Sequence, residues 1–238
     1  MRGKEASSAR PARRALRFLT LAGESSAETR VRGSAFHAIA APCHTEHDAR
    51  ELLASREKLL FDASHHCSAW RLRTGEWRAN DSGEPAGSAG APILAALDGA
   101  GLTDCAVVVT RYFGGTKLGV GGLIRAYGDA AALALKDAPR LVGSAATRVR
   151  LTYSYENTGI AMRAVEAAGA HNVVQGFSDR GSRGEVEFTL PASLYAEISD
   201  SLRARSAGAL VLEVLDERVL YTRPIEIPNS LDAARRRP

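Results

Sequence analysis

Residues Thr110 to Gly128 read TRYFGGTKLGVGGLIRAYG, a glycine-rich segment that joins two stretches of different periodicity. On its N-terminal side, Cys105 to Val109 is a short apolar run rich in β-branched residues, which predicts a buried strand. On its C-terminal side, Leu123 to Leu135 repeats apolar residues at helical spacing. Glycine tolerates positive φ and lets another backbone or a ligand come close. The segment therefore predicts a strand, a glycine-rich joint and a helix, in that order.

The joint is also cationic. Arg111, Lys117 and Arg125 surround it, and no acidic residue follows before Asp129. A helix N-terminus adds unpaired N–H groups and a partial positive charge. The glycine spacing of a P-loop or of a dinucleotide-binding turn does not occur. Two interpretations stay open: the glycines allow tight strand-to-helix packing, or the segment binds an anion. The expected anion site consists of Arg111, Gly114, Gly115, Lys117, Gly119, Gly121, Gly122 and Arg125.

Two further motifs lie upstream, HHCSAW at residues 65–70 and NDSGEPAGSAG at residues 80–90. Together with the glycine-rich segment they closely resemble the signature of the YigZ/IMPACT family, and the resemblance covers about residues 21–219. It implies an α+β protein of two domains. The N-terminal domain would be similar to the second domain of a small-subunit ribosomal protein. The C-terminal domain would be ferredoxin-like and resemble the last domain of elongation factor G.

The same resemblance implies a link to translation. Eukaryotic relatives regulate translation through a stress-responsive initiation-factor kinase pathway, whereas the bacterial members have no settled activity. One segment departs from the family pattern: Gly33-Ser34-Ala35-Phe36 stands where a Lys-Ser-Arg-Phe-like segment is usual. If the two missing cations contact a ligand elsewhere in the family, this chain binds it more weakly or uses Arg30 and Arg32 instead.

The C-terminal part has its own alternating pattern. Strands are expected at Thr147–Tyr155, Asn172–Phe177, Glu185–Leu190 and Ala209–Leu215, and helices at Gly159–Ala168 and Pro191–Arg205. This βαββαβ order is ferredoxin-like by pattern alone. Val186, Phe188 and Leu190 alternate with polar residues, so one sheet face should be covered and the other open to solvent, RNA or a protein partner.

The expected domain organisation follows from these segments. It consists of a basic disordered tail (1–20), an IMPACT-like α+β domain (21–143), a ferredoxin-like domain (147–217) and a C-terminal tail (218–238), with the joint near Ala138–Ala146. Residues 1–17 carry six Lys or Arg and one Glu, and residues 231–238 carry three Arg and one Asp. Since the net charge is +4, the rest of the chain has an excess of three acidic residues. Any nucleic-acid-binding patch on the body must therefore be local.

Cellular location is predicted from apolar runs and cysteines. Arg17 interrupts the best apolar candidate, Ala15 to Ala22, which is too short for a signal-peptide core or a membrane span. Cys43, Cys67 and Cys105 are odd in number and widely spaced, which argues against a disulfide framework and for a reducing compartment. We expect a cytoplasmic protein without membrane association.

Metal binding is not expected. The candidate ligands are Cys43, His44, His47, His65, His66 and Cys67. They contain no CxxC pair, and a strand would point His65 and Cys67 to one face and His66 to the other. No cofactor is expected either.

Three residues are candidates for catalysis: His66, Asp81 and Glu84. The two acids lie in a loop rich in glycine and proline, where functional residues are often displayed. With His66 they can act as a general base or hold magnesium beside a bound phosphate. The alternative is that Glu84 pairs with Arg111 or Arg125 and only makes the site rigid.

Two functions of different class follow. The first is a translation-linked regulator that binds RNA, the ribosome or a regulatory protein through the cationic joint and the C-terminal sheet. The second is an enzyme acting on a small phosphorylated or carboxylated substrate held by Arg111 and Lys117. The resemblance favours the first, and the sequence leaves the oligomeric state open.

Overall fold

The computed structural model describes residues 17–178 and 181–222, so the basic segment 1–16 and residues 223–238 lie outside the described part. The chain divides into two compact units. One contains Phe18–Val142 and is called the N-terminal unit; the other contains Gly143–Tyr221 and is called the C-terminal unit. Gly143 lies within the long strand β7, Arg140–Tyr153.

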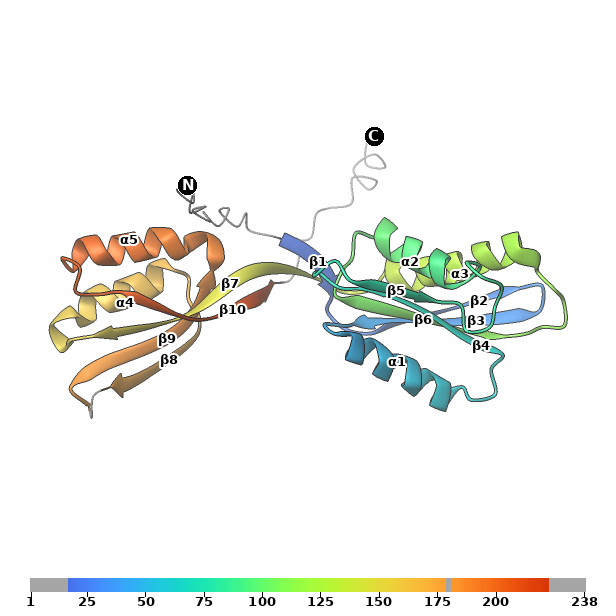
Figure 1. Ribbon diagram of the computed structural model, residues 1–238, viewed down its shortest axis with the longest axis horizontal. Coiled ribbons are helices and arrows are strands. Elements are labelled where there is room, and N and C mark those ends of the chain that lie inside the picture. Colours follow the sequence, from blue (N-terminus) through green and yellow to red (C-terminus); the bar gives the residue numbers. More distant parts are fainter. Residues whose placement is uncertain (1–16, 179–180, 223–238) are drawn as a thin grey trace, which may run out of the picture. The chain divides into compact units, whose positions relative to one another are not determined.

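The N-terminal unit is a five-stranded antiparallel sheet with helices on both faces (Figure 1). Its strand order is β2 (Ser25–Val31), β3 (Ser34–Pro42), β6 (Cys105–Tyr112), β4 (His65–Arg71) and β5 (Trp77–Asn80). Helices α2 (Gly90–Gly99) and α3 (Gly119–Lys136) cover one face, and α1 (Glu46–Leu59) lies on the other. Strand β1 (Arg17–Leu21) pairs with β7.

Central strand β6 explains why its sequence is an unbroken apolar run. Helices cover both of its faces, and every residue from Cys105 to Arg111 is buried. Small residues on α3, such as Ala126, Ala130 and Ala134, are fully packed and let that helix lie close to the sheet. Helix α1 begins with a capping box, in which Thr45 and Asp48 exchange hydrogen bonds.

The C-terminal unit confirms the predicted ferredoxin-like order. After β7 come α4 (Thr158–Ala167), β8 (His171–Ser178), β9 (Arg183–Pro191), α5 (Tyr195–Arg205) and β10 (Leu212–Thr222). The strand order is β10, β7, β9, β8, with β9 antiparallel to both of its neighbours. Val149, Leu151, Val186, Phe188 and Leu190 form the sheet side of its core.

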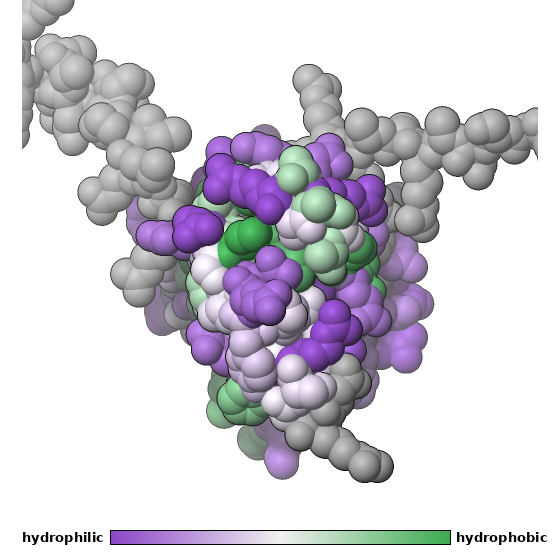
Figure 2. Space-filling model, turned by 90° about the vertical axis from the view of Figure 1, so that its left-hand side faces the viewer, coloured by the Kyte–Doolittle hydropathy of each residue, from purple (hydrophilic) through white to green (hydrophobic). Residues whose placement is uncertain are grey.

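The opposite face of this sheet is polar and internally paired. Arg148 and Arg150 of β7 both pair with Glu187 of β9, and Arg150 Nη2 lies 2.6 Å from Glu187 Oε1. Arg150 also lies 3.5 Å from Glu185 and from Glu213. These acids offset the cations, so the face is not a basic surface. In Figure 2, hydrophobic residues on the visible side of the C-terminal unit are interspersed with hydrophilic ones.

Several predicted boundaries were wrong. Helix α3 begins at Gly119, four residues before the predicted Leu123, because its glycine-rich first turn adds little to the apolar pattern. Residues 17–20 and 218–222, which the sequence places in tails, belong to β1 and β10. Both strands pair with β7, and such long-range pairing leaves little local signal. In the described residues, no helix has the length and apolarity needed to cross a membrane.

Candidate functional site

The glycine-rich loop packs against the tip of the β2–β3 hairpin. That tip is the two-residue turn Arg32-Gly33, and both residues have positive φ, 45° and 84°. A Cβ on Gly114 would lie only 1.9 Å from the carbonyl carbon of Gly33. Gly115 and Gly119 have φ values of 83° and 71°, which favour glycine. The packing interpretation of the glycines therefore holds for Gly114.

Beyond Gly114 the loop is open to solvent. Residues 113–117 and Gly119 to Gly121 are exposed, as are Lys117 and Arg125. Within residues 17–178 and 181–222, neither of these cations forms an ion pair. Helix α3 has no acidic residue in its first turn and no side-chain cap on its N-terminus. Its first N–H groups and two cations therefore face solvent in one region, as an anion site requires.

Arg111 differs from the other two cations because its side chain is only 5% exposed. Its Nη1 donates to Glu84 Oε1 at 2.6 Å, and its Nη2 donates to Ser34 Oγ at 3.3 Å. The rings of Phe36 and Phe113 lie 5.6 and 5.5 Å from its guanidinium carbon. The sequence left open whether Glu84 takes part in catalysis or pairs with Arg111 or Arg125. In the structure Glu84 pairs with Arg111. The guanidinium is thus engaged inside the protein.

Glu84 is the centre of a buried polar cluster. Its side chain is 4% exposed, and its Oε1 also accepts a hydrogen bond from Tyr127 Oη at 2.8 Å. His65 Nε2 lies 3.8 Å from the same oxygen. Burial raises the pKa of the neighbouring Cys67 thiol to about 12, and burial likewise raises the pKa of Tyr127. These groups hold their protons at neutral pH, so the cluster suits a stabilising role better than proton transfer.

The structure separates the three catalytic candidates. His66 lies on the face of β4 that α1 covers, and its Nδ1 is 3.1 Å from Thr110 Oγ1. Burial lowers the pKa of His66. Asp81 instead accepts backbone N–H groups from Gly87, Ala89 and Gly90, at 2.8 to 2.9 Å. Asp81 therefore fixes its loop to the start of α2, and no single constellation of His66, Asp81 and Glu84 forms.

The role of Asp81 predicts a pH-dependent stability. Burial alone would raise the pKa of Asp81. Its three backbone hydrogen bonds together have a larger effect in the opposite direction, so the pKa is lower than usual. A depressed folded-state pKa contributes stability above the unfolded pKa of about 3.9, and this stability is lost as pH falls through the folded pKa. We expect Asp81→Asn to destabilise the N-terminal unit by about 1–2 kcal/mol near neutral pH, and the difference to shrink in acid.

Urea unfolding followed by tryptophan fluorescence checks this expectation, since both tryptophans, Trp70 and Trp77, belong to the N-terminal unit. The measurement is made near neutral pH and again below about pH 3. A stability difference of the same size at both pH values would contradict the assigned role.

Sequence reasoning missed three partners of the buried cluster. Ser34 and Tyr127 were not singled out, and His65 was considered only as a zinc ligand. Strand alternation does place His65 with Cys67, and helical spacing places Tyr127 with Leu123 and Ala130. Neither rule predicts that His65 and Tyr127 both lie next to Glu84.

Comparisons with known proteins agree with this architecture. The pattern of the Impact N-terminal domain matches residues 32–135. An IMPACT family member of Haemophilus influenzae is 34% identical over 183 residues, covering 73% of this chain and 85% of that protein. The IMPACT family member YvyE of Bacillus subtilis is 48% identical over 93 residues, 36% of this chain and 43% of the relative's length, so that match spans less than half of YvyE.

The fold also matches a solved structure, described as the crystal structure of a hypothetical protein. The TM-score is 0.61 at 28% identity, covering 84% of this chain and 98% of that chain. The match to the Haemophilus influenzae protein extends beyond the Impact N-terminal domain and over most of both chains. This chain therefore belongs to the IMPACT family.

Proposed function

We propose that this protein binds RNA through the exposed part of the glycine-rich loop and the first turns of α3, and that it acts on translation through that binding. The observation that carries the proposal is the pair Lys117 and Arg125. Both cations are exposed, and among the described residues neither has an acidic partner. The N-terminus of α3 adds its own unpaired N–H groups. Phosphate oxygens are the ligands that such a surface favours.

Two neighbouring groups extend this surface. The side chain of Phe113 is 50% exposed at the start of the loop and offers an aromatic face on which a base can stack. Arg32 lies in the hairpin turn that packs on Gly114, so a third cation belongs to the same region. Arg30 is less suitable because it pairs with Glu28 at 2.9 Å. The surface is a local basic patch on a body that is not basic overall.

The enzyme alternative has less support. It requires Arg111 to hold the anionic group of a substrate, yet that guanidinium is buried and bound to Glu84. It also requires His66, Asp81 or Glu84 to exchange protons with a substrate held there, and His66 lies on the other face of the sheet, which α1 covers. Asp81 is engaged by three backbone N–H groups, and the side chain of Glu84 is almost fully buried.

The test is binding of a short RNA of mixed sequence to the full chain over a salt series. We expect Lys117→Ala with Arg125→Ala to weaken binding about tenfold at low salt. Removing two phosphate contacts should also reduce the slope of log Kd against log salt by about 1.4. The loss should be similar for RNAs of different sequence, because phosphate contacts carry no sequence information.

The matched control is Lys58→Ala with Lys136→Ala, which removes the same charge from the last turns of α1 and α3. Segment 1–16 is present in every variant, so its contribution stays constant. Equal loss of affinity in both double variants would mean that net charge, and not this loop, governs binding. Unchanged affinity in the Lys117/Arg125 variant would contradict the proposal directly.

A further inference from the structure

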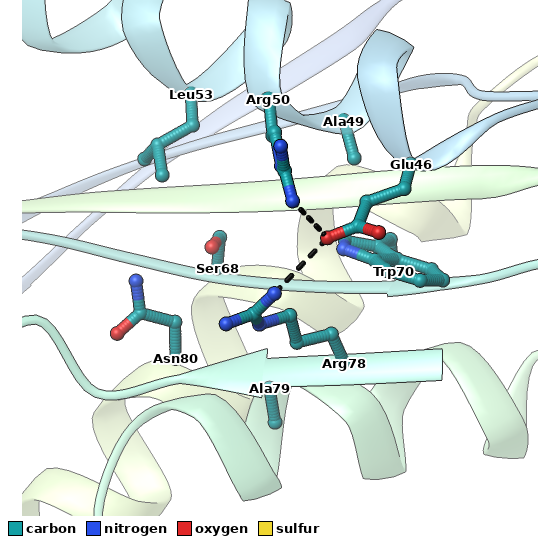
Figure 3. Close-up of a pocket in the computed structure, with 9 residues that line it drawn as sticks. All are labelled: Glu46, Ala49, Arg50, Leu53, Ser68, Trp70, Arg78, Ala79 and Asn80. Atoms are coloured by element: carbon teal, nitrogen blue, oxygen red, sulfur yellow. Dashed lines mark hydrogen bonds and ion pairs between the residues drawn. The ribbon is translucent and has the colours of Figure 1, made fainter. Parts of the chain in front are cut away.

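A second site lies on the other face of the N-terminal sheet, between α1 and strands β4 and β5. It is a cavity of about 390 Å³, a volume within the range of small-molecule sites. Figure 3 shows that side chains from the helix and from both strands converge on it. None of the residues used above for RNA binding lines it.

One part of this cavity is apolar. Trp70 of β4 is 9% exposed and forms part of the lining together with Ala49 and Leu53 of α1 (Figure 3). In Figure 3, Trp70 lies next to Glu46, whereas Leu53 lies on the other side of Arg50, toward Ser68. The apolar lining is therefore divided between the two ends of the cavity.

A second part of the lining contains two arginines that share the carboxylate of a glutamate. Glu46 Oε1 accepts a hydrogen bond from Arg50 Nη2 at 2.7 Å and another from Arg78 Nη1 at 3.0 Å (Figure 3). Hydrogen bonding to Arg50 is the largest cause that lowers the pKa of Glu46. Two guanidiniums share one carboxylate, which leaves one positive charge in excess. The side chains of Arg50 and Arg78 are 69% and 65% exposed, so both guanidiniums can be reached from solvent.

A third part of the lining is polar and can form hydrogen bonds with a ligand. Ser68 of β4 and Asn80 of β5 are register partners and both line the cavity. Asn80 Oδ1 accepts the N–H of Ser82 at 3.0 Å. Within the described residues, the Asn80 amide nitrogen and the Ser68 hydroxyl form no hydrogen bond. The Asn80 amide can thus donate a hydrogen bond to a ligand, and the Ser68 hydroxyl can donate or accept one.

We propose that this cavity binds a nucleoside monophosphate. The base lies against Leu53, with Ser68 and Asn80 at its edge (Figure 3). The phosphate lies between Arg50 and Arg78 and displaces Glu46. A free phosphate satisfies only the cationic part, and a free base satisfies only the rest, so the full ligand must bind more tightly than either.

The experiment uses the full chain carrying Trp77→Phe, which leaves Trp70 as its single tryptophan. Trp77 is exposed and does not line this cavity, so the change should not disturb it. Trp70 fluorescence is titrated with AMP, GMP, CMP and UMP, and separately with inorganic phosphate and adenosine. We expect a saturable change with at least one nucleotide, and a Kd lower than for inorganic phosphate or adenosine.

Variants then locate the phosphate. Arg78→Ala and Arg50→Ala should each weaken nucleotide binding about tenfold, since each loses a charge-assisted hydrogen bond. Glu46→Gln should tighten it several-fold, because the competing charge is removed. Arg203→Ala, on α5 of the C-terminal unit, is the matched control and should leave Kd unchanged.

Three outcomes would overturn the proposal. The first is no saturable change with any of the four nucleotides at millimolar concentration. The second is nucleotide affinity unaffected by both Arg50→Ala and Arg78→Ala. The third is equal affinity for inorganic phosphate and for the nucleotide that binds most tightly, which would remove the role of the base. Weaker binding in Glu46→Gln would overturn the displacement of Glu46.

Discussion

Arg111→Ala is expected to destabilise the N-terminal unit by about 3–5 kcal/mol. The change leaves the Glu84 carboxylate buried at 4% exposure without its cation, and it also removes the hydrogen bond to Ser34. The Phe36 ring loses the guanidinium that lies 5.6 Å from it. The free energy of unfolding is measured in urea by tryptophan fluorescence, which reports on this unit alone.

A double-mutant cycle separates the ion pair from general damage. Glu84→Gln removes the charge and keeps the shape, so Arg111 is then the unpaired group. If the two side chains act as a pair, the double variant loses less stability than the sum of the single losses, by about 1–3 kcal/mol. Strict additivity would contradict a direct pair. A loss of only about 0–1 kcal/mol in Arg111→Ala is the value expected for a solvent-exposed ion pair, and it would contradict the burial of this one.

Gly114→Ala is expected to cost about 3 kcal/mol. Its Cβ would lie 1.9 Å from the carbonyl carbon and 2.2 Å from the backbone nitrogen of the facing hairpin, atoms of Gly33 and Ser34. Backbone atoms cannot rotate away as a flexible side chain would, so the hairpin tip or the loop must move. The same urea experiment measures the loss.

Gly121→Ala is the matched control within the same glycine-rich segment. Apart from its chain neighbours and the nearby backbone of its own helix, a Cβ added at Gly121 would meet no atom within 4 Å, and the residue is helical. Alanine is a better helix former than glycine, so this change should stabilise the unit by about 0.5–1 kcal/mol. If both alanine changes had the same sign and size, close packing at Gly114 would not be the reason for its glycine.

Local signals in the sequence were enough for most of the fold. Thr45 followed by Asp48 is a local pattern typical of a helix start, as at α1, and the apolar run from Cys105 predicted the buried strand β6. Alternation of Val186, Phe188 and Leu190 with polar residues predicted a sheet covered on one face. Each of these features depends on residues within a few positions of one another, so periodicity and capping rules apply.

The burial of Arg111 could not be predicted in the same way. In the sequence it stands at the end of a strand beside glycines, which groups it with Lys117 and Arg125. Its burial depends on Glu84, 27 residues away, and on Ser34, 77 residues away. Only the register that places β3 and β4 beside β6 brings these groups together.

The candidate site was therefore only partly predictable. The exposed cations and the glycines that need positive φ lie in one continuous segment, and local chemistry identified them. The sequence favoured His66 beside that segment; His66 does contact Thr110, its first residue, but on the face of the sheet that α1 covers. The cavity below α1 also went unnoticed, because Glu46, Trp70 and Arg78 come from three elements that meet only in the folded sheet.

Hydrogen exchange of the full chain with and without RNA tests the proposed RNA surface most directly. Amides in the loop and the first turns of α3 have no cap and face solvent, so bound phosphates should slow their exchange. We expect slower exchange in peptides spanning residues 113–125, and no such change there in the Lys117/Arg125 double variant. RNA-dependent slowing confined to residues 1–16 or to the C-terminal sheet, with residues 113–125 unchanged, would contradict it.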